Sequence, residues 1–368
     1  MKILFIIEQY VDEGARYYRE FFRHLRRKGA SVSVVNLSES EPFLDDVGEF
    51  LHAYHPLALS GDYYKALPTL NRIIRDEGTS VIQAIETIPA FYAALAVLPV
   101  LRSRPPLVYG RRHGRTEGPV HKLMDQVAFS VSSKVIAVSE AMARVAREEH
   151  PWGKRKVIPI FSGIVLEAGV PKKEGEGRAL AELGKTEDRY TVLLLARLRP
   201  IKGHRIALQA AQILRRKGKS VRFLFVGEGP DREALQGEVA ARGLEDSVTF
   251  TGHVEHVREA LELADVMIIP SFADAFPKVM IEAFAAGLPV IASAVGGLTD
   301  MIEHGETGLL VPPGDGEALA EAIEALMADR QLADHISSRG KLVYEDALTP
   351  ETMVEAYWSV YRDLVEGR

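Results

Sequence analysis

Four charged side chains have types and spacing that could do chemistry on a sugar linked to a diphosphate. Asp274 and Glu282 stand eight positions apart across the predicted start of a helix, and Arg197 and Lys202 flank an earlier turn. Carboxylates accept hydrogen bonds from sugar hydroxyl groups, whereas fixed cations suit a diphosphate. Helix-start N–H groups and a glycine pair at residues 296–297 also favour an anion. The four side chains therefore suit a ligand with both groups.

The elements that position these residues alternate between strand and helix. An apolar run at residues 267–269 leads through a polar loop into a helical pattern that stops at Gly287, and a second β-rich run covers residues 289–293. Another predicted strand, residues 191–196, leads into Arg197 and Lys202. Ligands of an open parallel sheet sit outside the carboxyl ends of its strands, so we expect these loops to share one crevice.

The same alternation fills the first half of the chain, where it predicts a parallel sheet covered on both faces. The predicted strands cover residues 2–7, 31–37, 81–85, 107–109 and 134–138. The charged, glycine-bearing stretch 166–189 is the best linker candidate, so we place domains at 1–165 and 190–349. The last predicted helix, within residues 350–368, has apolar residues at helical spacing.

The stretch around Asp274 resembles the signature of the retaining GT-B glycosyltransferases of family 4, the glycosyl transferases group 1. Members usually carry two glutamates eight positions apart, and a G-R-L-x-x-x-K-G string that matches Arg197 and Lys202 here. The departures are Asp274, Ala275 and Ala196, where the family usually has glutamate, glycine and glycine. The resemblance covers nearly the whole chain and is strongest from residue 190 to 313. The other residues in register are Phe276, Pro277, Ala283, Gly287, Pro289 and Val290.

The resemblance implies a fold and a division of labour. The fold would be α/β of the GT-B type, with two Rossmann-like doubly wound domains facing a central cleft. Residues 1–165 would bind the acceptor and residues 190–349 the nucleotide-sugar donor. The helix at 350–368 would pack back on the first domain.

The resemblance also implies roles for single residues. Arg197 and Lys202 would hold the diphosphate, Glu282 the ribose hydroxyl groups and Asp274 the hydroxyl groups of the donor sugar. His113, part of a histidine-glycine pair at a predicted strand end, would contact the sugar from the other domain. Further contacts to the nucleotide are expected from Val254, Phe276, Lys278 and Val279.

The expected activity is hexosyl transfer from a UDP- or GDP-linked sugar to a hydroxyl group of a glycan, glycolipid or other acceptor, with anomeric retention. Cell-surface polysaccharide, lipopolysaccharide or glycolipid synthesis is the expected setting. No Asp-x-Asp motif stands at a strand end, so we expect neither a metal nor another cofactor. Two alternatives stay open: a nucleotide-sugar epimerase of the same fold, and a catalytically silent subunit that binds a sugar nucleotide.

Composition excludes several other classes. The 368 residues include no cysteine, and the apolar run at 90–101 is too short to cross a bilayer, which indicates a cytoplasmic protein. A net charge of −6 argues against nucleic-acid binding. Residues 1–165 nevertheless hold 22 basic and 18 acidic residues, or +4. A predicted helix near residues 15–28 has a basic face, which is either simply solvated or a peripheral contact with the inner face of a membrane.

Overall fold

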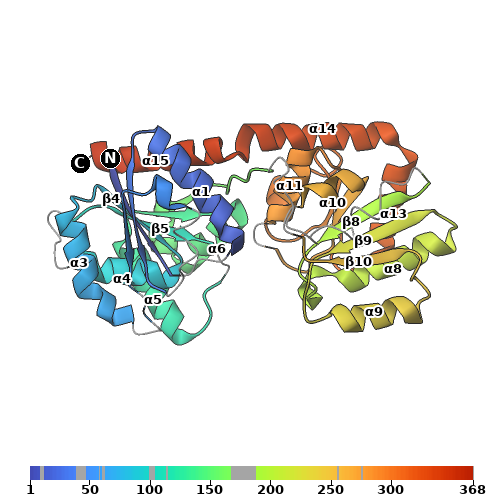
Figure 1. The fold of residues 1–368 in the computed structure, drawn as a ribbon, viewed down its shortest axis with the longest axis horizontal. Helices are drawn as coiled ribbons and strands as arrows, with labels where there is room; N and C mark the ends of the chain where they lie inside the picture. Colours follow the sequence, from blue (N-terminus) through green and yellow to red (C-terminus); the bar gives the residue numbers. More distant parts are fainter. Residues whose placement is uncertain are drawn as a thin grey trace. The chain divides into compact units, whose positions relative to one another are not determined.

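Two parallel β-sheets form the framework of the chain in the computed structural model (Figure 1). The structure describes residues 1–8, 12–38, 47–57, 59, 63–98, 104–112, 115–166, 188–254, 257–274 and 277–367. Two compact units contain them, one made of residues 1–163 and 347–368 and the other of residues 164–346. Of the stretch predicted as a linker, residues 167–187 lie outside the described residues.

The first sheet has the strand order β3-β2-β1-β4-β5-β6-β7, and every neighbouring pair is parallel. The chain order runs outward in both directions from the neighbours β1 and β4. This reversal leaves a crevice at the carboxyl ends of those two strands, where an open α/β sheet binds its ligand. The strands are β1 (Lys2–Ile7), β2 (Ser31–Asn36), β3 (Ala53–Pro56), β4 (Val81–Ile85), β5 (Leu107–Arg111), β6 (Lys134–Ala137) and β7 (Val157–Pro159).

The second sheet has the order β10-β9-β8-β11-β12-β13 and is also parallel throughout, so its reversal lies between β8 and β11. All six residues of β9 are buried, as expected for a strand covered on both faces. The predicted α/β class is confirmed. The strands are β8 (Tyr190–Leu195), β9 (Val221–Val226), β10 (Val248–Gly252), β11 (Val266–Ile269), β12 (Val290–Ser293) and β13 (Leu309–Val311).

Helices cover the sheets of both units. Those of the first unit are α1 (Asp12–Arg27), α3 (Leu67–Asp76), α4 (Thr87–Val97), α5 (Pro119–Val131), α6 (Glu140–Glu149) and α15 (Pro350–Glu366), with 3₁₀ turns η1 (Gly48–Phe50), η2 (Tyr63–Ala66) and η4 (Pro151–Lys156). Those of the second are η5 (Pro200–Lys202), α8 (His204–Arg216), α9 (Arg232–Ala241), α10 (Arg258–Leu263), α11 (Lys278–Ala286), α12 (Leu298–Met301), α13 (Gly316–Ala328) and α14 (Arg330–Ala347). Of the helices that the structure describes, none combines the length and the apolarity needed to cross a bilayer.

The C-terminal helix α15 packs on α1 (Figure 1). The ring of Phe21 on α1 meets Tyr357 edge-on at 4.9 Å and Phe5 of β1 at 5.6 Å. Tyr361 on α15 donates a hydrogen bond of 2.8 Å to Gln83 of β4. The last segment of the chain therefore completes the core of the first unit.

The basic face of α1 is engaged within its own unit. Arg23 pairs with Glu20 at 2.7 Å, and Arg26 donates to the backbone carbonyl of Glu49. Lys28 pairs with Glu355 on α15. These contacts favour a structural role for three of the basic side chains, and the membrane contact of this helix stays a prediction.

Candidate functional site

The four charged residues of the sequence motif follow strands of the second sheet. Arg197 lies two residues beyond the end of β8, and Lys202 ends the 3₁₀ turn η5 on the same loop. Asp274 lies on the loop after β11, and Glu282 lies on α11, the helix that this loop leads into. Because β8 and β11 are the neighbours at which the strand order reverses, both loops open at the preferred ligand position of the sheet.

A close backbone approach joins these two loops. Gly203 has φ +73°, and a Cβ atom on it would lie 1.9 Å from the carbonyl oxygen of Pro270. The backbone N–H of Phe272 also donates to the carbonyl of Ile201 at 2.8 Å. Only glycine fits at position 203, since any side chain there would separate the loops.

The loop after β12 fixes Asp274 from the other side. The N–H of Gly297 donates to the Asp274 carbonyl at 2.9 Å, and a Cβ atom on Gly296 would lie 2.1 Å from the same oxygen. The glycine pair of the sequence motif therefore positions the backbone of Asp274. Main-chain contacts therefore join three strand-end loops.

The central contact of the site is an ion pair between Lys202 and Asp274. Lys202 Nζ donates to Asp274 Oδ2 at 2.6 Å. The side chains are 30% and 10% exposed, so the pair is partly shielded from water. Sequence reasoning gave these residues to different parts of the ligand and did not foresee that they contact each other.

The other motif residues lie around this pair. Arg197 is exposed, and no ion pair or hydrogen bond of its guanidinium is found among the described residues. On α11, Lys278 is exposed while Val279 and Glu282 are half-buried. The residue before this helix, Pro277, makes no capping hydrogen bond with its side chain. The positive end of a helix favours an anion.

Three other positions were predicted to contact the donor, and these contacts stay predictions. Val254 is half-buried just beyond β10. His113 and Phe276 lie outside the described residues.

His204, which sequence reasoning did not single out, is buried directly behind the turn that carries Lys202. Its ring packs edge-on against Phe225 at 5.2 Å, and neither ring nitrogen has a hydrogen-bond partner in the described part of the chain. Burial lowers the pKa of His204; Asp231 opposes this shift, and the charges of Lys202 and Arg205 add to it, so that the pKa is about 4. The imidazole is therefore neutral at pH 7.

A cavity of about 340 Å³ opens in the first unit at the equivalent place, the reversal between β1 and β4. Glu86, which follows β4, has φ +75° and ψ 170°, a combination that is almost restricted to glycine. Strain of this kind tends to occur at functional sites. The cavity is lined by Glu8, Glu86, Thr87, Ile88, Arg115, Thr116, Glu117 and His121.

A buried polar network lies against two of these lining residues. Thr87 Oγ1 is 2.9 Å from the hydroxyl of Tyr109, which donates to Asp125 Oδ1 at 2.8 Å. The backbone N–H of Thr116 donates to Glu149 at 3.2 Å. These contacts fix the threonines from beneath the cavity.

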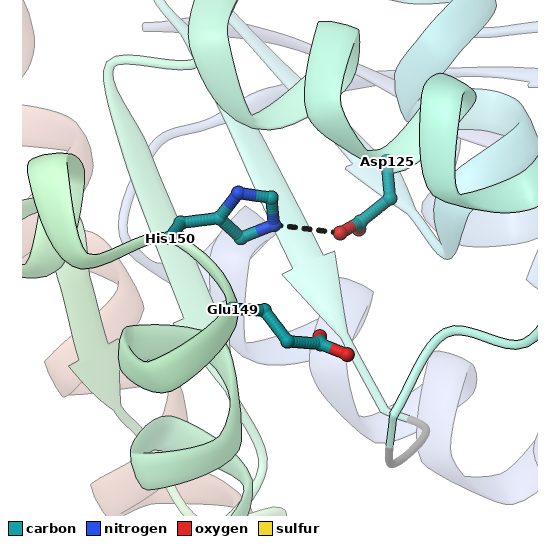
Figure 2. A group of neighbouring side chains, drawn as sticks. All are labelled: Asp125, Glu149 and His150. Atoms are coloured by element: carbon teal, nitrogen blue, oxygen red, sulfur yellow. Dashed lines mark hydrogen bonds and ion pairs between the residues drawn. The ribbon is translucent and has the colours of Figure 1, made fainter.

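Asp125, Glu149 and His150 could in principle hold a metal ion, because their ligand atoms lie close together (Figure 2). The fully buried guanidinium of Arg111, however, pairs with Glu149 and lies 3.6 Å from Asp125. His150 Nε2 is 2.7 Å from Asp125 Oδ2. Since a cation of the protein already compensates these carboxylates, we interpret the cluster as a structural ion-pair network.

The charges of this network stabilise the ionised form of Asp125. Burial raises its pKa, but the hydrogen bond from His150 and the charge of Arg111 lower it more, so that the net pKa is below the ordinary value. Sequence reasoning missed this network because the partners of Arg111 lie on separate helices with no shared motif.

Family models decide which proteins this chain is related to. The model described as glycosyl transferases group 1 matches residues 177–343, and the model described as glycosyltransferase family 4 matches residues 14–167. The chain belongs to glycosyltransferase family 4. The two matches together take in both units of the structure.

Several curated proteins are related to this family 4 chain over different lengths. An exopolysaccharide phosphotransferase of Streptomyces coelicolor is 37% identical over 48% of this chain and 19% of its own length. The alpha-D-kanosaminyltransferase of Streptomyces kanamyceticus is 32% identical over 45% and 43%. The matches therefore span less than half of these two relatives. The capsular polysaccharide biosynthesis glycosyltransferase CapM of Staphylococcus aureus is 24% identical over 97% and 96%.

A solved structure confirms the fold expected for family 4. The crystal structure of the Anabaena protein HepE in complex with UDP is 21% identical and superimposes with a TM-score of 0.80, covering 98% of this chain and 99% of that one. At this identity the likeness concerns the fold alone. The predicted GT-B fold is confirmed.

Proposed function

We propose that this protein transfers a sugar from a nucleoside-diphosphate sugar to an acceptor hydroxyl group, with retention at the anomeric carbon. The observation that carries the proposal is the placement of Arg197, Lys202 and the start of α11 around the reversal between β8 and β11. Fixed cations and a helix start at that place suit a diphosphate. Family membership supports the same activity.

The positive groups stabilise the charge that develops during the reaction. Breaking the bond between the anomeric carbon and the diphosphate oxygen leaves cationic character on the sugar and negative charge on the leaving group. Arg197 and Lys202 offer N–H donors to that leaving group, and the N–H groups at the start of α11 add to them. A cation on a strand-end turn is fixed before reaction, so little reorganisation is needed as charge develops.

The two carboxylates take the neutral parts of the donor. Glu282, on the second turn of α11, binds the ribose hydroxyl groups, and Asp274 binds hydroxyl groups of the donor sugar. Val254, Phe276, Lys278 and Val279 complete the nucleotide contacts. These roles come from the family resemblance, and the half-buried position of Glu282 is compatible with its role.

The acceptor belongs to the cavity of the first unit. Its hydroxyl-bearing Thr87 and Thr116 are held by the buried network, and His121 and Glu117 add further polar groups. Such a lining suits a polyol better than an apolar molecule. His113 keeps its expected role beside the donor sugar.

The proposed reaction requires neither a metal nor another cofactor. Arg197 and Lys202 supply the positive charge that a divalent cation supplies to diphosphate leaving groups elsewhere. The donor is linked to UDP or GDP. In the cell we place the enzyme in the synthesis of a polysaccharide or related glycoconjugate, because one relative that matches along nearly its whole length is named for capsular polysaccharide biosynthesis.

Turnover of a radiolabelled donor, measured with and without an acceptor mixture, tests this proposal against its two rivals. A transferase should consume donor mainly when acceptor is present and release labelled glycoside. An epimerase would convert donor without acceptor, and a silent binding subunit would bind donor without turnover. Either of the last two results would overturn the proposed function.

A further inference from the structure

The ion pair between Lys202 and Asp274 links two residues that the proposed function assigns to different parts of the donor. Lys202 serves the diphosphate, whereas Asp274 serves the sugar. Because their side chains are in contact at 2.6 Å, a ligand that binds one of them also affects the other.

This pair is preorganised by the backbone on both sides. Gly203 holds the turn of Lys202 against Pro270, and Gly297 donates to the carbonyl of Asp274. With both loops fixed, little conformational entropy is lost in forming the pair, and the 10% exposure of the carboxylate limits screening by water. The contact is therefore stronger than a typical surface ion pair.

This arrangement disfavours the binding of a free nucleoside diphosphate. If the phosphate oxygens replace the carboxylate on Lys202, the ion pair is lost. If the carboxylate stays, two like charges share one ammonium group, which is also unfavourable. In both cases Asp274 weakens the binding of the diphosphate.

An intact donor behaves differently because it carries hydroxyl groups. When the diphosphate takes the donors of Lys202, the hydroxyl groups of the attached sugar can donate to the carboxylate of Asp274 in their place. The hydrogen bonds lost to Lys202 are thereby replaced. The free nucleoside diphosphate left after transfer offers no such replacement.

We propose that Asp274 is a specificity-determining residue that favours the intact donor over the free nucleoside diphosphate, through its ion pair with Lys202. This inference rests on the proposed function, because it assigns Lys202 to the diphosphate. It means that the carboxylate both recognises the substrate sugar and weakens binding of the product nucleotide. Product release is assisted because the ion pair forms again as the nucleoside diphosphate leaves.

Calorimetry on Asp274→Asn tests the proposal. The probes are three intact donors, UDP-glucose, UDP-N-acetylglucosamine and GDP-mannose, and the two free diphosphates UDP and GDP. The donor that the wild-type protein binds most tightly is compared with its own free diphosphate throughout. We expect the variant to bind the free diphosphate about tenfold more tightly and the intact donor no better or less tightly. Asp246→Asn, the same change at an exposed residue before β10, should alter neither affinity and controls for net charge.

A gain in affinity for the free diphosphate without a gain for the intact donor separates this role from structural damage. A folding defect at position 274 would weaken both ligands together, and that result, like unchanged diphosphate affinity, would overturn the inference. Wild-type protein that binds none of the five nucleotides would instead refute the proposed function, and the inference with it. Because this second failure is already visible in the wild type, the two are distinguishable.

Discussion

A Cβ atom on Gly203 would lie 1.9 Å from the carbonyl oxygen of Pro270, so these two residues hold the loops after β8 and β11 in contact. Gly203 also ends η5 and begins the run into α8 with φ +73°. The position of Lys202 relative to the rest of the site depends on this approach.

Gly203→Ala should therefore destabilise the second unit and weaken nucleotide binding. Gly218, just beyond the other end of α8, has φ +69° but nothing within 4 Å of its Cβ position, so Gly218→Ala is a matched control with strain only. Chemical denaturation should show Gly203→Ala to be less stable than Gly218→Ala by about 1 to 3 kcal/mol. Equal losses would mean that the approach to Pro270 is not a constraint.

Arg197 should contribute to donor binding without contributing to folding. Its side chain is exposed and makes no ion pair or hydrogen bond within the described residues, so Arg197→Ala should leave the melting temperature unchanged. Loss of a charged hydrogen bond to phosphate costs roughly 1.5 to 3 kcal/mol, which corresponds to a fall of about ten- to hundredfold in donor affinity. Arg199→Ala, at an exposed residue of the same loop, is the control and should bind normally. Wild-type affinity in Arg197→Ala would remove this residue from the site.

Transfer should persist in excess EDTA. The positive charge at the proposed diphosphate site comes from Arg197, Lys202 and a helix start, and Arg111 already compensates the carboxylates of Asp125 and Glu149. Elemental analysis of the purified protein should find no stoichiometric metal. A loss of transfer in chelator that Mg²⁺ or Mn²⁺ restores would contradict this part of the mechanism.

The buried His204 should make stability depend on pH in the acid range. Its pKa is about 4 in the folded chain and 6.5 ordinarily, so between these values the unfolded state binds a proton that the folded state does not. The free energy of unfolding should therefore fall as the pH drops from about 6.5 to about 4. Between pH 7 and pH 5 this residue accounts for a loss of about 2 kcal/mol.

His204→Phe provides the comparison for this pH effect, because a phenyl ring keeps the edge-on contact with Phe225 and leaves no unpaired nitrogen behind. Denaturation at pH 7 and pH 5 should show a smaller difference for this variant than for the wild type. His253→Phe, at an exposed histidine, should retain the wild-type difference. A wild-type pH dependence in His204→Phe would place the titrating group elsewhere.

Periodic patterns were enough to predict most of the architecture from the sequence. Strand runs such as Lys2–Ile7 and Val81–Ile85 were predicted with the bounds that the structure has, because buried strands of a parallel sheet have nearly continuous apolar sequences. The stop of α11 at Gly287 was also predicted, and Gly287 has φ +65°. Patterns of this kind depend on neighbouring residues in the sequence, so they can be recognised without knowledge of the tertiary structure.

The contacts that define the site could not be read from the same patterns. The motif placed Lys202 and Asp274 on neighbouring loops, but their ion pair depends on the close approach of Gly203 to Pro270 and on the support of Asp274 by Gly297. The network around Arg111 was missed for a similar reason, since Asp125 and Glu149 come from different helices. A motif gives the residue types of a site, whereas tertiary contacts decide which side chains compensate each other.

Glycine at position 86 should make the protein more stable. Glu86 occupies a backbone region that costs a residue other than glycine about 1 to 3 kcal/mol, so Glu86→Gly should relieve strain and raise the melting temperature. Glu117→Gly is the control, because it removes another carboxylate of the same cavity at a residue without positive φ. This change should lower the melting temperature. An equal loss of stability in both variants would mean that the backbone strain at Glu86 does not destabilise the folded protein.

The strained backbone of Glu86 also bears on how this protein would respond to selection for heat resistance. In the described part of the second unit, every residue with positive φ is a glycine, so that unit offers no strain of this kind to relieve. The first unit keeps a glutamate where glycine would fit more easily. Thermostable variants selected without regard to activity should therefore accumulate changes at position 86, and their loss of transfer should be seen as weaker use of the acceptor while donor binding stays intact.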